Sequence, residues 1–297
     1  MNPQDRTVEE LIGRMATKQH GVVTWAQLLE AGISKEKIKG RVRSRALLRV
    51  HRGVYRVGHR APSVEARYLA AVLACGEGAR LTGLAAGHLW GLLRGAAPPA
   101  EVTAPTERRV KGVKTRRARR DRADDDVTTC RGIPVTTIPR TLVDLASVLS
   151  LEALARACHE AGVKYRTTPR QVEEVLARRP NPPGATKLRR VLHGDTRVTL
   201  SALERRFLQL LGEAGLPLPE TNKPAGSHRV DCRWPDHGLT VELDSYRYHN
   251  SRHSWELDHR RAREARRRRD EFCRYTYGDV FDSPRVVVSE VSELLGV

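Results

Sequence analysis

Apolar positions recur with helical spacing in two short stretches near the N-terminus. Over residues 8–15 the apolar side chains have a helical period, and Thr7 is the expected N-cap. A second helix is expected after Thr24, because Thr24 and Gln27 have the spacing of a capping box and Gly32 can end the helix. The pattern therefore predicts two helices within the first 32 residues.

The next residues predict a third helix and a hairpin. The helix Lys35–Arg45 is expected to follow Ser34 as its cap, with Ile38 and Val42 facing inward. Beyond it, apolar and polar positions alternate around Gly53, which can adopt a positive φ, so a short hairpin is expected. Helices followed by a basic hairpin are typical of a winged helix-turn-helix.

The middle of the chain mixes helical and strand patterns. Apolar helices are expected at 63–75 and 81–93, then a strand at 101–105, and after a further strand more helices as far as Leu192. The segment 107–122 carries nine basic and two acidic residues. It is either a loop or edge hairpin that contacts phosphate, or a solvated basic loop, and the sequence favours neither.

From residue 199 the pattern changes to that of a mixed α/β domain. An amphipathic helix at 201–215 precedes two strands, 228–234 and 239–246, joined by a tight turn. A basic helix, a strand and a closing helix at 284–295 follow. We therefore expect a mixed α/β protein of three domains, with boundaries at 1–60, 61–196 and 197–297.

The C-terminal hairpin brings acidic residues together. If residues 235–238 form its loop, Asp231 lies directly opposite Glu242, with Cβ atoms about 5 Å apart, and Asp244 points to the same side. Opposed like charges destabilise a sheet, so a divalent cation is the natural compensation. Glu204, in the preceding helix, is a weaker candidate for the same site. The alternatives are an ordinary solvent-facing strand and, for Glu204, a favourable interaction with the helix dipole.

The charge of the chain points to a polyanionic partner. Its 297 residues hold 53 Lys and Arg against 35 Asp and Glu, a formal charge of +18. Nucleic acid is the first choice of partner. No apolar run approaches the roughly 18 residues of a membrane span, and the N-terminus is too polar for a signal peptide. We therefore expect a cytoplasmic protein that does not bind a membrane.

Two basic stretches are candidate contacts with DNA. Residues 1–60 carry thirteen basic and five acidic residues, which predicts DNA binding, the alternative being a solvated basic face. Residues 252–269 hold eight arginines and three acids, and form either a helix along a phosphate backbone or a solvated charge run. The expected DNA contacts are Lys35, Lys37, Lys39, Arg41, Arg43, Arg45, Arg52, Arg260, Arg263 and Arg267.

The N-terminal sequence also resembles a known family. Residues 21–58, GVVTWAQLLEAGISKEKIKGRVRSRALLRVHRGVYRVG, look like the N-terminal domain of AbiEi-type antitoxins from type IV toxin–antitoxin systems. The resemblance implies promoter binding, and a cognate toxin or a second copy of the chain as a protein partner. Residues 61–196 still resemble this antitoxin-like family.

Residues 199–295 resemble the PD-(D/E)XK nuclease core, and closely the very-short-patch-repair-like endonuclease domain. The motif stands here as VDCRWPD and VELDSYRYH. The resemblance implies that Asp231 and Glu242 hold Mg²⁺ or Mn²⁺ and that Asp244 orients the water in phosphodiester hydrolysis. Asp244 stands where the wider superfamily has Lys, so His249 is the candidate for part of the proton handling, and Ser245 stands where Gly is usual.

The sequence therefore predicts a bacterial DNA-binding protein with a metal-dependent endonuclease domain, in defence, repair or a toxin–antitoxin context. The alternative is an antitoxin-like transcriptional regulator whose nuclease-like domain is inactive and only binds DNA or a partner. The enzyme is slightly favoured, because a purely binding domain has no need of opposed carboxylates.

Overall fold

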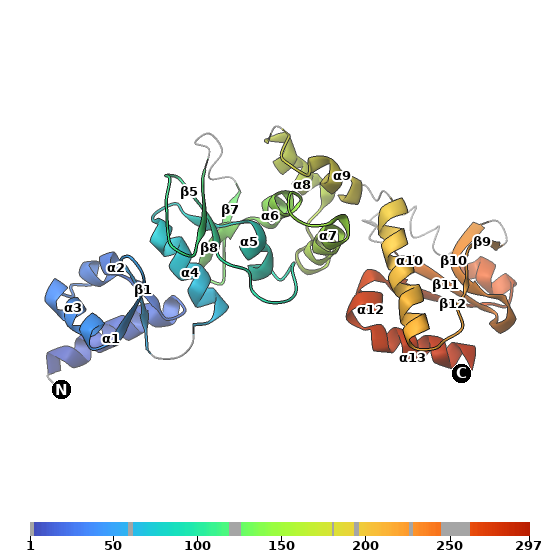
Figure 1. The fold of residues 1–297 in the computed structure, drawn as a ribbon, viewed down its shortest axis with the longest axis horizontal. Helices are drawn as coiled ribbons and strands as arrows, with labels where there is room; N and C mark the ends of the chain where they lie inside the picture. Colours follow the sequence, from blue (N-terminus) through green and yellow to red (C-terminus); the bar gives the residue numbers. More distant parts are fainter. Residues whose placement is uncertain are drawn as a thin grey trace. The chain divides into compact units, whose positions relative to one another are not determined.

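The computed structural model describes residues 3–58, 62–118, 126–179, 181–192, 196–225, 228–244 and 262–297, without the side chains of 3–7, 196–202, 225, 228 and 244. The chain forms two compact units: unit 1 is Met1–Leu145 with Glu174–Pro180, and unit 2 is Ala146–Glu173 with Asn181–Val297. Both combine helices with sheets (Figure 1), so the expected mixed α/β class is confirmed. None of the helices in these ranges has the length and apolar character that a membrane crossing requires.

The N-terminal part of unit 1 packs three helices on a three-stranded antiparallel sheet of order β1-β3-β2. Apolar side chains from all six elements form one core, in which Leu28 and Ile38 are fully buried. The elements are α1 Pro3–Lys18, β1 Val22–Thr24, α2 Trp25–Glu30, α3 Lys35–Arg43, β2 Leu47–His51 and β3 Val54–Val57.

The local signals at α2, α3 and the hairpin act as predicted. Thr24 and Gln27 form a capping box, in which the Thr24 hydroxyl accepts from the Gln27 amide at 3.1 Å. Ser34 caps α3 by accepting from the amide of Lys37. Gly53 turns the hairpin between β2 and β3 with φ +73°, a conformation in which a side chain would be strained.

Two helix boundaries differ from the prediction. Thr7 is not an N-cap, because α1 already begins at Pro3, a residue favoured in the first turn of a helix. The third helix ends at Arg43 rather than Arg45. Arg45 has φ +63° and lies beyond the helix, where the chain reverses into β2.

The second part of unit 1 is built on a five-stranded sheet of order β6-β5-β4-β8-β7. The predicted helix 81–93 is shorter, because Leu81 is fully buried and pairs with Val102 and Val135 as a strand. A short buried strand cannot be told from a helix by apolar content alone. The elements are α4 Val64–Cys75, β4 Arg80–Leu81, α5 Gly83–Leu89, β5 Glu101–Ala104, β6 Lys114–Arg117, β7 Val127–Cys130, β8 Ile133–Thr136 and α6 Ile138–Leu145.

Unit 2 places α10, α12 and α13 against a four-stranded sheet of order β12-β11-β10-β9 (Figure 1). Strands β9, β10 and β11 are antiparallel, whereas β11 and β12 are parallel. The elements are α7 Leu151–Tyr165, α9 Ala185–Leu192, α10 Thr196–Glu213, β9 Glu220–Ala225, β10 His228–Trp234, β11 Leu239–Asp244, β12 Glu271–Thr276, α12 Tyr277–Asp282 and α13 Pro284–Leu295. The helix α8, Pro169–Ala177, contains the boundary between the two units.

The predicted amphipathic helix, hairpin and closing helix are present in unit 2, with three corrections. The amphipathic helix begins at Thr196 rather than at residue 201, so Glu204 lies in its interior and not near its first turn. Strand β9 had no clear sequence signal and was not expected. The final strand, expected over residues 271–280, ends at Thr276, because Thr276 and Asp279 form a capping box that starts α12.

Candidate functional site

The β10–β11 hairpin has the register that the sequence predicts. Cys232 pairs with Val241 and Trp234 with Leu239, and one further step in this register places Asp231 opposite Glu242. Since Cys232, Trp234 and Val241 are buried in the core beneath α10, the alternation of side chains puts both carboxylates on the other face of the sheet. The connection 235–237 is a 3₁₀ turn that ends at Gly238 in the left-handed region.

Asp231 is held in place by the neighbouring strand. Its Oδ2 accepts a hydrogen bond of 2.8 Å from the backbone amide of Leu243 on β11. This contact lies just beyond the Cys232–Val241 pair of the two strands. Glu242 is only 3% exposed. The hairpin therefore offers two carboxylates, one oriented by a backbone donor and one buried.

Glu204 lies on α10, and its charge interacts with that of Asp231. Its side chain is half-buried, and burial together with the negative charge of Asp231 raises its pKa. The pKa of Cys232 is raised first by burial and then by Asp231, Glu204 and Glu242. The charges of all three carboxylates thus act on Cys232, where α10 packs against the hairpin.

The donor set fits a hard cation such as Mg²⁺. Within the described residues, no three His, Cys, Asp or Glu side chains form a ready metal-binding group. Mg²⁺ commonly keeps several waters and uses only one or two carboxylates, which Asp231 and Glu242 provide. The side chain of Asp244 and all of His249 lie outside the described residues.

An ion-pair cluster around Asp270, on the same sheet face, has no counterpart in the sequence analysis. Asp270 is 5% exposed and accepts two hydrogen bonds from Arg233, at 2.9 and 3.1 Å. It also accepts from the Thr240 hydroxyl at 2.7 Å and from Arg268 at 3.3 Å. Burial alone would raise the pKa of Asp270, but these hydrogen bonds outweigh it and lower the pKa. A charged Arg233 inside a strand was the only sequence signal for this cluster.

The basic stretch that precedes β12 is partly described. Residues 262–267 are helical, and Arg263 and Arg267 are exposed, as phosphate contacts require. Arg260 lies outside the described residues. Arg268 is directed to Asp270, so this arginine stabilises the fold.

In unit 1, only part of the predicted DNA-contacting set is exposed. Lys35, Lys39 and Arg43 on α3 are exposed. Arg41 is different: its side chain is 11% exposed, and it donates to Glu9 at 2.8 Å and to the Lys37 carbonyl at 3.1 Å. This arginine ties α3 to α1.

The other predicted contacts flank α3. Lys37 is half-buried within the helix, whereas Arg45 is exposed just after it. Arg52 is exposed at the turn of the β2–β3 hairpin. The helix and the hairpin turn therefore both expose basic side chains to solvent.

The basic segment after β5 is partly neutralised within the protein. Lys114 and Arg116 on the edge strand β6 form ion pairs with Glu101, at 3.3 and 2.8 Å, and Glu101 is itself buried. Arg109 is 93% exposed at its side chain and pairs only loosely, at 3.7 Å, with the exposed Glu107. Residues 107–118, the described part of this segment, are therefore neither wholly a solvated loop nor wholly a phosphate-binding surface, and residues 119–122 lie outside the described residues.

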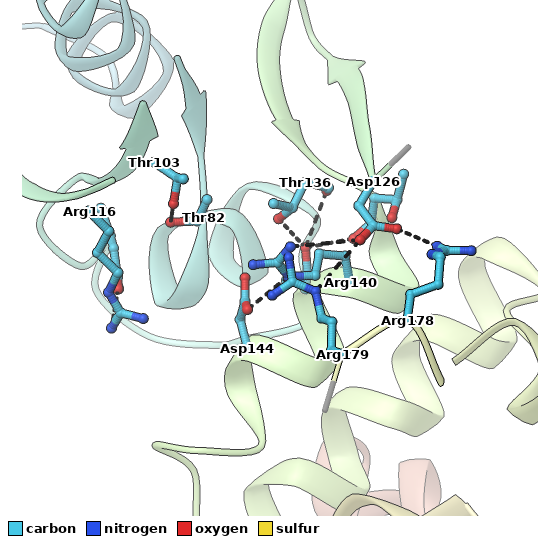
Figure 2. A network of polar contacts seen from close by, with 12 residues as sticks. Thr82, Thr103, Arg116, Asp126, Thr136, Arg140, Asp144, Arg178 and Arg179 are labelled. Atoms are coloured by element: carbon cyan, nitrogen blue, oxygen red, sulfur yellow. Dashed lines mark hydrogen bonds and ion pairs between the residues drawn. The ribbon is translucent and has the colours of Figure 1, made fainter. Parts of the chain in front are cut away.

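Unit 1 also contains a buried ionic network (Figure 2). Asp126 is 5% exposed and pairs with Arg178 at 2.6 Å, and Arg140 bridges it to Asp144. Burial raises the pKa of Asp144, and Arg140 offsets this only in part. The network fixes the residues that follow β8 to the end of α8, a structural task that sequence spacing did not reveal.

In comparisons with known proteins, no family model and no curated protein matches this chain.

Proposed function

We propose that this chain is a DNA-binding, metal-dependent endonuclease. In this proposal residues 1–60 form a winged-helix domain and residues 197–297 a restriction-endonuclease-like domain, joined by residues 61–196. The observation that carries the proposal is the pairing register that brings Asp231 and Glu242 together on one sheet face. DNA in the cytoplasm is the partner that the excess of basic residues favours.

The electrostatics of the pair support a metal site. Two opposed carboxylates repel each other, and burial together with the negative charge of Asp231 raises the pKa of Glu204. Keeping such a group costs stability unless a cation binds there. Function therefore explains this arrangement better than stability does.

The roles of the side chains follow from their places. Asp231, oriented by the Leu243 amide, and Glu242 would hold Mg²⁺ or Mn²⁺, which supplies Lewis acidity and a water of lowered pKa. Asp244 would orient the attacking water, which loses a proton as its bond to phosphorus forms, while the leaving oxygen takes up a proton as its own bond to phosphorus breaks. Glu204, whose pKa is raised by burial and by the charge of Asp231, and His249 are the groups suited to proton handling.

DNA binding is assigned to α3 and the hairpin. The exposed bases Lys35, Lys39 and Arg43 lie on a helix that projects from a small core, and Arg52 lies at the turn of the adjoining hairpin. A winged helix places such a helix in the major groove and its hairpin along the backbone. Arg263 and Arg267 would add backbone contacts near the carboxylate pair.

One observation favours the alternative function, that of a regulator with an inactive nuclease-like domain. Glu242 is only 3% exposed, so a phosphodiester could reach a metal bound to it only through protein that covers the carboxylate. In that case the chain binds its own promoter, or a toxin, without cleaving DNA.

Cleavage of supercoiled plasmid distinguishes the two functions. The full-length protein should convert it to nicked or linear forms only with Mg²⁺ or Mn²⁺. Glu242→Gln should abolish this, whereas Glu271→Gln, which neutralises an exposed acid at the start of β12, should not. Metal-independent nicking, or equal loss in both variants, would rule out the assigned site.

A further inference from the structure

Arg274 lies beside the carboxylate pair on the neighbouring strand. In the parallel pairing of β11 with β12, Glu242 is the register partner of Arg274. Directly paired residues of adjacent strands point to the same face of a sheet, which here is the face of Asp231 and Glu242. Tyr275, the next residue, is buried in the core on the opposite side, as this alternation requires.

The Arg274 side chain is partly enclosed by the protein. The residue is half-buried, and its Nε atom is buried. A guanidinium held in this way is preorganised, because much of its rotamer entropy has already been lost on folding.

Two further arginines on this face interact within the protein. Arg233 is bound by both oxygens of Asp270, and Arg229 donates to the Asn222 carbonyl at 2.7 Å. Among the described arginines of this sheet face, Arg274 is the register partner of Glu242.

We propose that Arg274 binds the non-bridging oxygens of the scissile phosphate next to Glu242. This rests on the proposed endonuclease function and names a further catalytic residue for it. A phosphodiester brought to the carboxylate pair is repelled by it, and a guanidinium on the same face of the sheet offsets that repulsion. Its planar donors match two phosphate oxygens, and because it stays charged at all working pH values it neither gives nor takes a proton.

The role predicts an effect on the chemical step rather than on metal binding. Charge on the non-bridging oxygens is best stabilised by donors already in position, and loss of one such donor commonly lowers kcat by about a hundredfold. Arg274→Ala should therefore lower kcat by about this factor, with a smaller change in KM. Arg274→Lys should recover part of kcat, since it keeps the charge but loses the bidentate geometry.

The test uses the full-length protein and a short DNA duplex in Mg²⁺. Multiple-turnover cleavage at varied DNA concentration gives kcat and KM, and calorimetric titration with Mn²⁺ without DNA reports the metal site. Arg285→Ala is the matched control, because Arg285 is an exposed arginine on α13, against the opposite face of the sheet. We expect a hundredfold loss in Arg274→Ala, unchanged Mn²⁺ affinity, and wild-type cleavage in the control.

The possible failures are distinguishable. Cleavage by Arg274→Ala at the wild-type rate would overturn the assignment of Arg274 and leave the endonuclease function standing. No cleavage by the wild-type protein would overturn both. If Arg274→Ala melts well below the wild type, Arg274→Lys decides between the outcomes. A lysine variant with a normal melting temperature, normal Mn²⁺ binding and a lowered kcat supports the role. A lysine variant with the wild-type kcat refutes bidentate binding.

Discussion

Asp270→Asn should weaken unit 2 strongly without touching the proposed metal ligands. Asp270 accepts four hydrogen bonds, three from arginines and one from Thr240, and its side chain is 2% exposed. Asparagine keeps the shape but removes the charge and one acceptor. The arginines Arg233 and Arg268 then lose their carboxylate partner while remaining 23% and 20% exposed at their side chains.

The expected loss in local stability is about 3 kcal/mol. Removing one partner of a fully buried ion pair costs about 3–5 kcal/mol, and the partial exposure of both arginines places this case at the lower end. Because 1.4 kcal/mol is a factor of ten, amide exchange should become about a hundredfold faster.

Hydrogen exchange in the full-length protein, followed by mass spectrometry, measures this loss. The peptides of interest cover β10, β11 and β12, and the matched control is Asp236→Asn, at an exposed acid in the turn between β10 and β11. The control should exchange as the wild type does. Equal exchange in the two variants would refute a stabilising role for Asp270.

The effect should depend on pH with a definite sign. The pKa of folded Asp270 lies below its ordinary value, so its stabilisation is present above the unfolded pKa of about 3.9 and lost as the pH falls through the folded pKa. The difference between wild type and Asp270→Asn should thus be complete at pH 7 and shrink below about pH 4.

Two further predictions concern DNA and metal binding. Replacing Lys39 and Arg43 together by alanine should flatten the slope of log K against log salt by about two units, as measured by fluorescence anisotropy with duplex DNA. Arg41→Ala should leave that slope unchanged, because Arg41 is bound to Glu9, so equal slopes in both variants would argue against α3. Mg²⁺ or Mn²⁺ should raise the melting temperature of the wild-type protein but not of Asp231→Ala, since ligand binding to the native state stabilises it; a shift that persists in the variant places the metal elsewhere.

Local signals predicted the parts of the fold that depend on neighbours in sequence. The cap at Thr24, the cap at Ser34 and the turn at Gly53 are each defined within four residues, and all three are present. The β10–β11 register was predictable for the same reason, because a short turn fixes which residues pair.

Interactions between distant residues were not predictable. Arg233 and Asp270 are 37 positions apart, and Arg41 and Glu9 are 32 apart, so nothing in their spacing links them. Arg41 lies on a basic helix and was therefore expected to contact DNA, although its partner Glu9 lies on another helix. The sequence did not predict that Arg274 lies beside Glu242. The two residues are neighbours through a parallel strand pair, whose register depends on the connection between the strands rather than on a tight turn.

The central claim is that Asp231 is part of a metal-dependent cleavage site, and Asp231→Asn tests it most directly. Asparagine retains an oxygen that can accept from the Leu243 amide, so the hairpin should be preserved while the charge is lost. The measurement is the rate of plasmid nicking in Mg²⁺ by purified full-length wild type, Asp231→Asn and the control Asp236→Asn. We expect nicking by the wild type and the control and none by Asp231→Asn. Equal nicking by all three, or none by the folded wild type in either Mg²⁺ or Mn²⁺, would contradict the proposed function.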